Sequence, residues 1–118
     1  DSENENKEAN REEIRKSDEL ASRYSGPTRI YYNLAGRIHT YLPIPIYKCE
    51  GSGKVVLAIT VTPSGEVTEA KIITGESTAT DQCLFETATR TARLTRFNAD
   101  AAISRNQTGT LTYLFVAQ

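Results

Sequence analysis

The sequence predicts a small α+β domain in which one helix packs across a small antiparallel β-sheet. Three observations predict this fold. Apolar residues alternate on both sides of a turn within 53–73, they recur at helical spacing after Thr80, and nearly every residue in 109–116 is β-branched, aromatic or aliphatic. The expected order is strand, strand, helix, strand, with an extra N-terminal hairpin as an alternative. A length of 118 residues suits one domain with some additional chain.

The first 27 residues differ in composition from the rest of the chain. Residues 1–25 hold eight acids and five bases, with few large apolar side chains. The spacing of Glu12 and Lys16 is one that stabilises a helix, but this segment cannot bury enough apolar surface to fold alone. We therefore expect a charged helical spacer over 1–27 and a folded domain over 28–118, with its core over 53–118.

Two extended stretches precede the core. β-rich runs on either side of the Ala-Gly pair at 35–36 predict a hairpin, or at least two extended pieces. The chain from Pro43 to Tyr47 is expected to be extended, because Pro43 and Pro45 lack an N–H and bias their neighbours away from helix. We refer to residues 43–47 as the lead-in segment.

The clearest strand begins at Gly53 and ends at Val61, and its alternate side chains are apolar on one face. Thr-Pro-Ser-Gly at 62–65 has turn chemistry, and the return strand covers about 66–73. Val67 and Ala70 break the alternation of that return strand. A β-bulge between these two residues would restore it.

The helix is expected to begin after Thr80 or Asp81, either of which can act as an N-cap. Arg96 lies near its end, where a cation is favourable. The final strand alternates apolar with polar side chains. In that strand Leu111, Tyr113 and Phe115 alternate with Thr110, Thr112 and Leu114. We expect the buried face to contain Val55, Leu57, Ile59 and Val61 from the first core strand with Leu84, Ala88 and Ala92 from the helix.

Composition narrows the function. The chain is 38% hydrophobic and 25% charged, with a formal net charge of −1, so neither a nucleic acid nor an anionic membrane surface is an expected partner. No apolar run approaches the roughly 18 residues that a membrane-spanning helix needs. The absence of an initiator Met predicts that a targeting or anchoring segment has been removed.

The two cysteines, Cys49 and Cys83, form either one disulfide or two buried free thiols. A disulfide would close a loop of about 35 residues and add roughly 3–4 kcal/mol on the chain-entropy model. It would also indicate an oxidising compartment such as a periplasm.

Catalytic and metal-binding patterns are weak in this sequence. His39 has no recognisable nucleophile or carboxylate beside it, so we interpret it as a surface residue. One histidine and two separated cysteines make a poor zinc site. The Gly-rich run 50–54 does not precede a helix, so it is not a phosphate-binding loop. The sequon at 106–108 matters only in a eukaryotic secretory context. We expect neither an enzyme nor a cofactor.

The motifs together resemble the C-terminal domain of TonB-family energy transducers from Gram-negative envelopes. The resemblance covers roughly residues 41–118. It rests on a Gly-x-Val strand start, a Pro-x-Gly-x-Val turn, an Ala-rich helix ending in Arg-Phe and an alternating last strand. In this sequence the matching residues are Gly53, Val55, Leu57, Val61, Pro63, Gly65, Val67, Ala88, Ala92, Arg96, Phe97, Leu111, Tyr113 and Phe115.

Some positions depart from that family pattern. Ala99 stands where the family often has proline, and the Gln-Pro-x-Tyr-Pro lead-in is replaced by Leu42 followed by the lead-in segment. The short helix usual before the first core strand is reduced to 48–52. Cys49 and Cys83 are not part of the general motif, and a bond between them would tie the lead-in to the start of the helix.

The resemblance implies a function in the periplasm. Such domains bind a short extended segment, the TonB box of an outer-membrane transporter, by strand addition. Inner-membrane proton-channel motor proteins drive them through an N-terminal anchor, which in this protein would lie upstream of the spacer over 1–27. The implied partner-binding residues are Gly109, Thr110, Leu111, Thr112, Tyr113, Leu114 and Phe115 on the last strand, with Pro43, Pro45 and Tyr47 in the lead-in.

This implied site would explain why the chain ends on a strand so ready to pair. A terminal strand is often a sheet edge, and natural proteins usually protect such edges. Here we expect an open edge that a partner closes, or that a second copy of the chain closes in a homodimer. Two other functions stay open: a TonB-like interaction or assembly module without energy coupling, and a small secreted enzyme or inhibitor.

Overall fold

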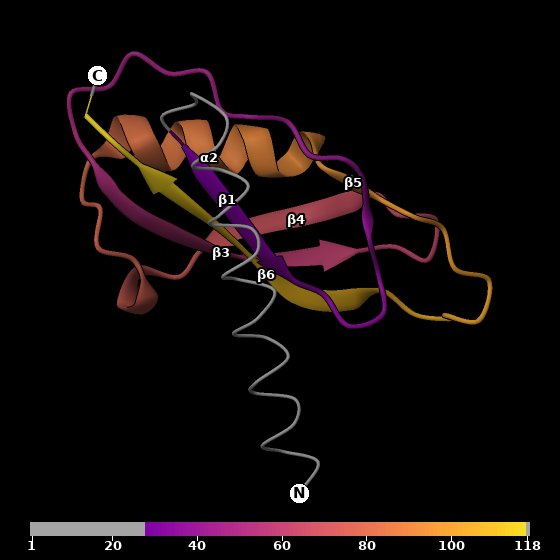
Figure 1. Ribbon diagram of the computed structural model, residues 1–118. Helices are drawn as coiled ribbons and strands as arrows, with labels where there is room; N and C mark the ends of the chain where they lie inside the picture. The colour runs from indigo at the N-terminus through magenta and orange to yellow at the C-terminus, as the bar shows by residue number, and fades with distance from the viewer. Residues whose placement is uncertain (1–27, 118) are drawn as a thin grey trace, which may run out of the picture.

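The computed structural model describes residues 28–117, and the helical spacer predicted over 1–27 lies outside them. The described chain forms a small α+β domain, with a four-stranded antiparallel sheet and one helix packed on one face of it (Figure 1). Its elements in order are β1 (Arg29–Asn33), β2 (His39–Tyr41), β3 (Gly53–Val61), β4 (Val67–Ile72), the 3₁₀-helix η1 (Thr74–Glu76), α2 (Gln82–Leu94), β5 (Arg96–Phe97) and β6 (Gln107–Phe115).

The strand order in the main sheet is β1-β6-β3-β4. The expected core order of strand, strand, helix, strand is confirmed, and the sheet has one strand more than the three in that order. β1 adds a fourth strand beside β6, and its side chains Ile30 and Tyr32 pack against the core. The terminal strand β6 therefore lies inside the sheet, which corrects the prediction that it is an open edge.

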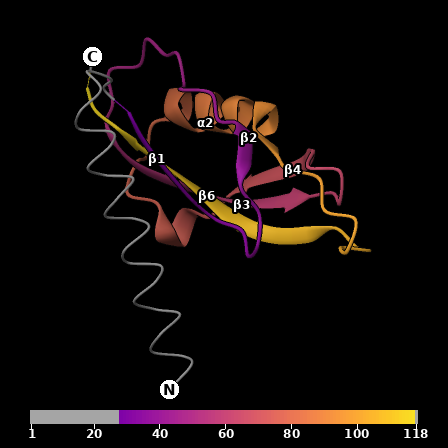
Figure 2. The same cartoon turned by 45° about the vertical axis from the view of Figure 1, so that its right-hand side comes forward.

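The two extended pieces predicted around 35–36 are present, but they do not form a hairpin with each other. β1 pairs with β6, whereas β2 pairs with β5 in a separate two-stranded antiparallel ribbon. After a turn at 35–36 the chain crosses the end of the domain, as Figure 2 shows. Local sequence signals identify extended chain, but they do not choose its partner strand.

The turn between β3 and β4 closes with a hydrogen bond from the N–H of Gly65 to the carbonyl oxygen of Thr62, at 2.9 Å. Thr60 pairs with Glu69 but Val61 pairs with Val67, so one extra residue of β4 is accommodated between them. This irregularity is the β-bulge predicted between Val67 and Ala70.

The core lies between the sheet and α2. The helix begins after Asp81, whose side chain accepts a hydrogen bond from the N–H of Cys83 at 2.8 Å, as the N-cap prediction required. At the other end, the guanidinium of Arg96 donates to the carbonyl oxygens of Arg93 and Thr95. The predicted buried face is confirmed at each position: Val55, Leu57, Ile59, Val61, Leu84, Ala88 and Ala92 are all buried. Leu111, Tyr113 and Phe115 of β6 are buried with them.

Cys49 and Cys83 form a disulfide, with 5.8 Å between their Cα atoms. The bond joins the chain just after the lead-in to the first turn of α2, which settles the choice between a disulfide and two free thiols. Among residues 28–117, no helix is long and apolar enough to cross a membrane.

Candidate partner-binding site

The predicted docking strand is paired along both sides. Thr110 lies opposite Asn33 of β1 and opposite Ala58 of β3, and the same double pairing continues to Leu114. Direct addition of a partner strand to 110–114 is therefore blocked while β1 is in place. The seven predicted residues form one strand, as expected, but not an open edge.

The register shows which way the backbone groups of β6 point. The N–H of Ile73 donates to the carbonyl oxygen of Val56 at 2.7 Å, so the polar groups of Val56 face β4. Neighbouring residues in an antiparallel strand point to opposite sides. Leu57 therefore faces β6, and its opposite residue Leu111 faces β3. A proline at Leu111 would break the inner sheet rather than test a docking edge.

The same alternation directs Thr112 of β6 toward β1. Thr112 lies opposite Tyr31, so the backbone groups of Tyr31 face β6 and those of Ile30 and Tyr32 face away from the sheet. The outer border of the sheet on this side is thus formed by Ile30 and Tyr32. Their side chains lie on the face that α2 covers.

The lead-in segment meets the end of β6 through Tyr47. Its hydroxyl donates to the carbonyl oxygen of Val116 at 3.0 Å and accepts from the hydroxyl of Thr28 at 3.3 Å. Its ring packs edge-on against Phe115, with 4.9 Å between centroids. The structure therefore brings Tyr47 and Phe115 together, as the predicted site requires.

The prolines of the lead-in segment are less exposed than their neighbours. Pro45 is buried and Pro43 is partly exposed. Ile44 and Ile46 between and after them are 58% and 89% exposed. The lead-in thus presents two isoleucines to solvent close to the point where Tyr47 holds the end of β6. These isoleucines were not among the predicted site residues, although their alternation with proline is visible in the sequence.

Arg37 is a second residue that sequence reasoning missed. It is only 4% exposed. Its guanidinium donates to the carbonyl oxygens of Asn98 and Thr62 and to the side-chain oxygen of Gln107. These acceptors come from three separate segments: the turn between β3 and β4, the loop after β5, and the first residue of β6. Arg37 therefore links the β1–β2 connection to all three segments. No local signal distinguishes such a buried arginine from an exposed one.

His39 is exposed, as predicted. Its Nδ1 lies 2.9 Å from the hydroxyl of Tyr32, and the same hydroxyl accepts from the N–H of His39 at 3.2 Å. These contacts tie β2 to β1. Within residues 28–117, no three His, Cys, Asp or Glu side chains are grouped so that they could hold a metal ion.

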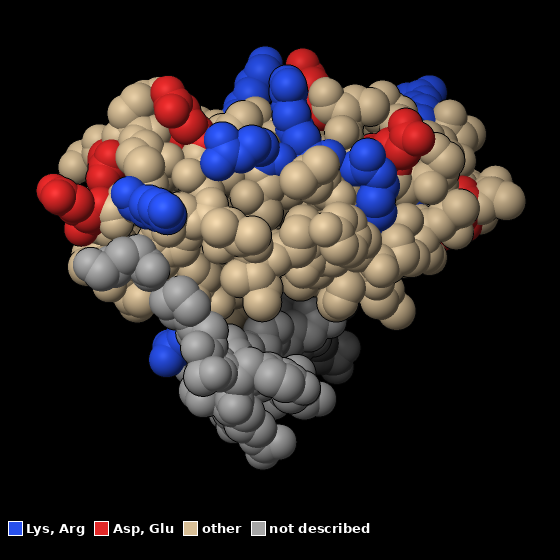
Figure 3. All heavy atoms as spheres, turned by 90° about the horizontal axis from the view of Figure 1, so that it is seen from above, with Lys and Arg blue, Asp and Glu red and all other residues tan. Residues whose placement is uncertain are grey.

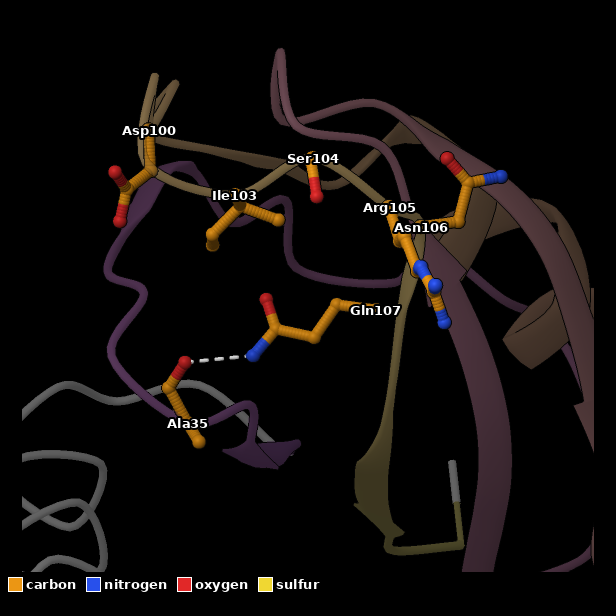
Figure 4. A pocket seen from close by; sticks show the side chains of 7 residues that line it. All are labelled: Ala35, Asp100, Ile103, Ser104, Arg105, Asn106 and Gln107. Atoms are coloured by element: carbon orange, nitrogen blue, oxygen red, sulfur yellow. Dashed lines mark hydrogen bonds between the residues drawn. The ribbon is translucent and has the colours of Figure 1, made fainter.

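A pocket of about 480 Å³ opens beside the start of β6, lined by 103–107 with Ala35 and Asp100 (Figure 4). Two of its polar side chains have structural partners. The side-chain amide of Gln107 donates to the carbonyl oxygen of Ala35 at 2.7 Å, and Asp100 accepts from the N–H of Ala102 at 3.0 Å. This arrangement supports the loops and presents no acid–base pair.

Tyr113 carries the one strongly shifted pKa in the described chain. Burial raises the pKa of its hydroxyl well above the ordinary value, and neighbouring Thr95 offsets only part of that rise. Although Thr95 is close enough to have this effect, the Tyr113 hydroxyl makes no hydrogen bond within the described residues. The hydroxyl lies in the core, so we expect its raised pKa to affect how the stability of the fold depends on pH.

Comparisons of the chain with protein families, with curated proteins and with solved structures found no match. The function is therefore argued from the residues and from their geometry.

Proposed function

We propose that this chain is the periplasmic partner-binding domain of a TonB-like envelope adaptor. In this function it binds an extended segment of an outer-membrane transporter by strand addition and couples that transporter to an inner-membrane proton-driven motor. The observation that carries the proposal is the pairing of β1 with β6. The outer side of the last strand is paired there with a short strand, and Tyr47 of the lead-in segment bonds to the residue that follows β6.

β1 has the features of a strand that a partner can replace. It covers five residue pairs on β6 and lies at the border of the sheet. It follows directly on the charged segment 1–27, and its burial is partial along its length. Main-chain hydrogen bonds supply the affinity in strand addition, and a partner strand would form the same ladder with Thr110, Thr112 and Leu114 that β1 forms now.

The chemistry of the surroundings supports the same reading. The disulfide fits an oxidising compartment such as the periplasm. The exposed isoleucines of the lead-in, Ile44 and Ile46, precede Tyr47, which bonds to the residue that follows β6. Apolar contacts there would add specificity to a backbone ladder that carries little sequence information.

An NMR titration tests the proposal. The probes are extended peptides from the periplasmic N-termini of outer-membrane transporters of the same organism. Binding by exchange predicts shift changes throughout 110–114 and in β1, together with loss of the β1–β6 cross-strand contacts. A set of such peptides that leaves every resonance unchanged near millimolar concentration would refute the proposed function.

Two proline variants separate exchange from addition to the outside of β1. Tyr31→Pro removes an N–H that faces β6, so it weakens β1 and should strengthen peptide binding if β1 is displaced. Ile30→Pro removes an N–H that faces outward and leaves the ladder to β6 intact. Loss of binding in Ile30→Pro, without a gain in Tyr31→Pro, would instead place the partner on the outer border of β1.

A further inference from the structure

The opposite border of the sheet is formed by β4. Within residues 28–117 its outer side meets another strand only just before its first residue, where Glu66 bridges to Arg96 of β5. Because Ile73 bonds to Val56, the alternation along β4 directs Lys71 toward β3 and Ile72 away from it. Ala70 also faces outward, but this residue is 8% exposed. Ile72 is partly exposed and its N–H and carbonyl point away from β3, so this residue is the candidate for pairing on this border.

A groove of about 620 Å³ runs between this border and the outer face of α2. Its apolar surface comes from Ile72, Phe85 and Leu94, and Leu94 is 51% exposed. Ile72 and Phe85 are partly buried and pack against the edge of the core, and Leu94 lies at the exposed end of α2. A groove of this size is within the range that binds ligands or single anchoring side chains.

The charges at the groove are mainly positive. Arg90 and Arg93 line it and are exposed, and Glu86 is the acid among its lining residues. Seen from above, from the side that α2 covers, Lys and Arg side chains gather across the middle of the face (Figure 3). An occupant with carboxylates beside an apolar group would match both the charge and the apolar surface.

A second copy of the chain fits this border poorly. If two β4 strands paired about a two-fold axis at Lys71, each Lys71 would face its copy directly, and like charges opposite each other are destabilising. The charge pattern therefore favours a different, acidic chain.

We propose that the β4–α2 groove is a second docking site, which binds an acidic, apolar extended segment of a partner protein. The backbone of that segment pairs with Ile72, an apolar side chain enters between Phe85 and Leu94, and a flanking carboxylate bonds to Arg90 and Arg93. This site is on the opposite border of the sheet from β1, so it is independent of the proposed function and could serve while the β6 side is occupied.

The test uses the full chain and one designed probe, the peptide acetyl-Asp-Val-Glu-Val-Asp-Ile-Glu-amide, followed by NMR and calorimetry. We expect shift changes at Ile72, Phe85, Leu94 and the arginine side chains, with none in β1. The control probe has the same sequence but is N-methylated at alternate residues, which removes the donors needed for pairing, and it should bind about tenfold more weakly.

Charge-reversal variants provide the matched comparison. Arg90→Glu with Arg93→Glu should weaken the acidic peptide by roughly tenfold or more. Lys54→Glu with Arg105→Glu makes the same change in net charge outside the groove and should leave affinity within about twofold, after allowance for long-range screening. Both pairs of substitutions lie on partly or fully exposed residues, so folding is expected to be retained.

Any of four results would overturn the proposal. The first is equal affinity for the N-methylated peptide, and the second is saturable binding of octanoate with the same shifts. Either would show an anion-binding apolar groove without strand pairing. Concentration-dependent dimerisation that the groove variant abolishes would identify a second copy as the occupant. Equal loss of affinity in both charge-reversal pairs would show nonspecific attraction.

Discussion

Arg37 donates to the carbonyl oxygen of Asn98 through both Nε and Nη2, at 3.0 and 2.7 Å. The two residues are far apart in the sequence, and the shared acceptor fixes the loop after β5 against the β1–β2 connection. The acceptors of this buried guanidinium are carbonyl and amide oxygens, so the cation is satisfied by dipoles. Such an arrangement works only when the acceptors are held in place by the rest of the fold.

Replacing this arginine should be costly. Arg37→Ala removes both donor contacts to the carbonyl of Asn98 and one of the two donors to the carbonyl of Thr62, which keeps its bond from the N–H of Gly65. It also leaves a hole where the buried guanidinium lay, and we expect a loss of about 2–4 kcal/mol in the free energy of unfolding. Arg37→Lys keeps the charge but not the fork geometry, so it should recover only part of that loss. Arg105→Ala, at an exposed position, should change stability by less than about 0.5 kcal/mol. Urea denaturation gives the free energy of unfolding of all three variants. An equal loss of stability in Arg37→Ala and Arg105→Ala would refute the proposed stabilising role of the Arg37 hydrogen bonds.

Gly65 should not tolerate a side chain. Its φ is 98°, and a Cβ there would collide with the carbonyl oxygen of Phe97. The N–H of Phe97 also bonds to the carbonyl of Gly65 at 2.9 Å, so the two segments cannot separate without cost. We expect Gly65→Ala to lower stability by about 3 kcal/mol.

Gly75→Ala is the matched control for Gly65→Ala, because a Cβ at Gly75 meets no atom within 4 Å. It should be close to neutral in the same thermal and urea unfolding measurements. If the two alanine variants unfold alike, the close approach of Phe97 does not limit position 65.

The disulfide should contribute substantially to stability. Its two cysteines are 34 residues apart in the sequence. A cross-link over a loop of that size lowers the conformational entropy of the unfolded chain, so its removal should cost roughly 3–4 kcal/mol of stability. The double variant Cys49→Ala with Cys83→Ala, or reduction of the native chain, should lower the denaturation midpoint accordingly. The intact native chain should have a mass about 2 Da below that of the reduced chain. Full thiol labelling without reductant would contradict the bond.

Stability should fall steeply at alkaline pH because of Tyr113. Burial raises its pKa in the folded state above that of the unfolded chain. The unfolded chain therefore loses this proton first as the pH rises above about 10, and the free energy of unfolding falls by up to about 1.4 kcal/mol per pH unit until the folded-state pKa is passed. Below the unfolded pKa the contribution is complete and does not vary with pH.

Tyr113→Phe should remove that part of the alkaline slope. At neutral pH it should have little cost, because the hydroxyl makes no hydrogen bond among the described residues and its removal leaves no donor unpaired. The measurement is unfolding free energy against pH for both proteins. An unchanged slope above pH 10 in Tyr113→Phe would assign the alkaline loss to other tyrosines.

Local pattern was sufficient to predict much of this fold. The alternation within β3 identified the buried residues from Val55 to Val61, and the broken parity of β4 located its bulge. Asp81 was predicted as a cap because short polar side chains at that position satisfy free N–H groups. Each of these predictions depends on neighbours within a few residues.

Pairing over long sequence distances was not predicted. β1 joins β6 at Tyr31 and Thr112, and nothing in either segment encodes a register with the other. The sequence therefore indicated a pairing-prone last strand, but it did not show that β1 already fills the place beside it. Arg37 was missed for a related reason, since its acceptors come from loops that only the complete fold brings together. The groove at Ile72 was also not predicted, because its lining combines β4 with residues of α2 that only the fold brings together.

The attachment of β1 has a mechanical consequence for any pull on the chain before Thr28. Such a load enters the sheet at the pair Arg29 and Leu114, and the disulfide gives no protection there because Cys49 lies further along the chain. Detachment of β1 and of the following segment would release up to about 70 Å of extended chain between Thr28 and Cys49. The covalent bond to α2 then stops further extension. The domain thus contains a segment of fixed length that ends at a covalent bond. It can extend under tension only when Leu34 and Tyr47 leave the core and Arg37 loses its acceptors.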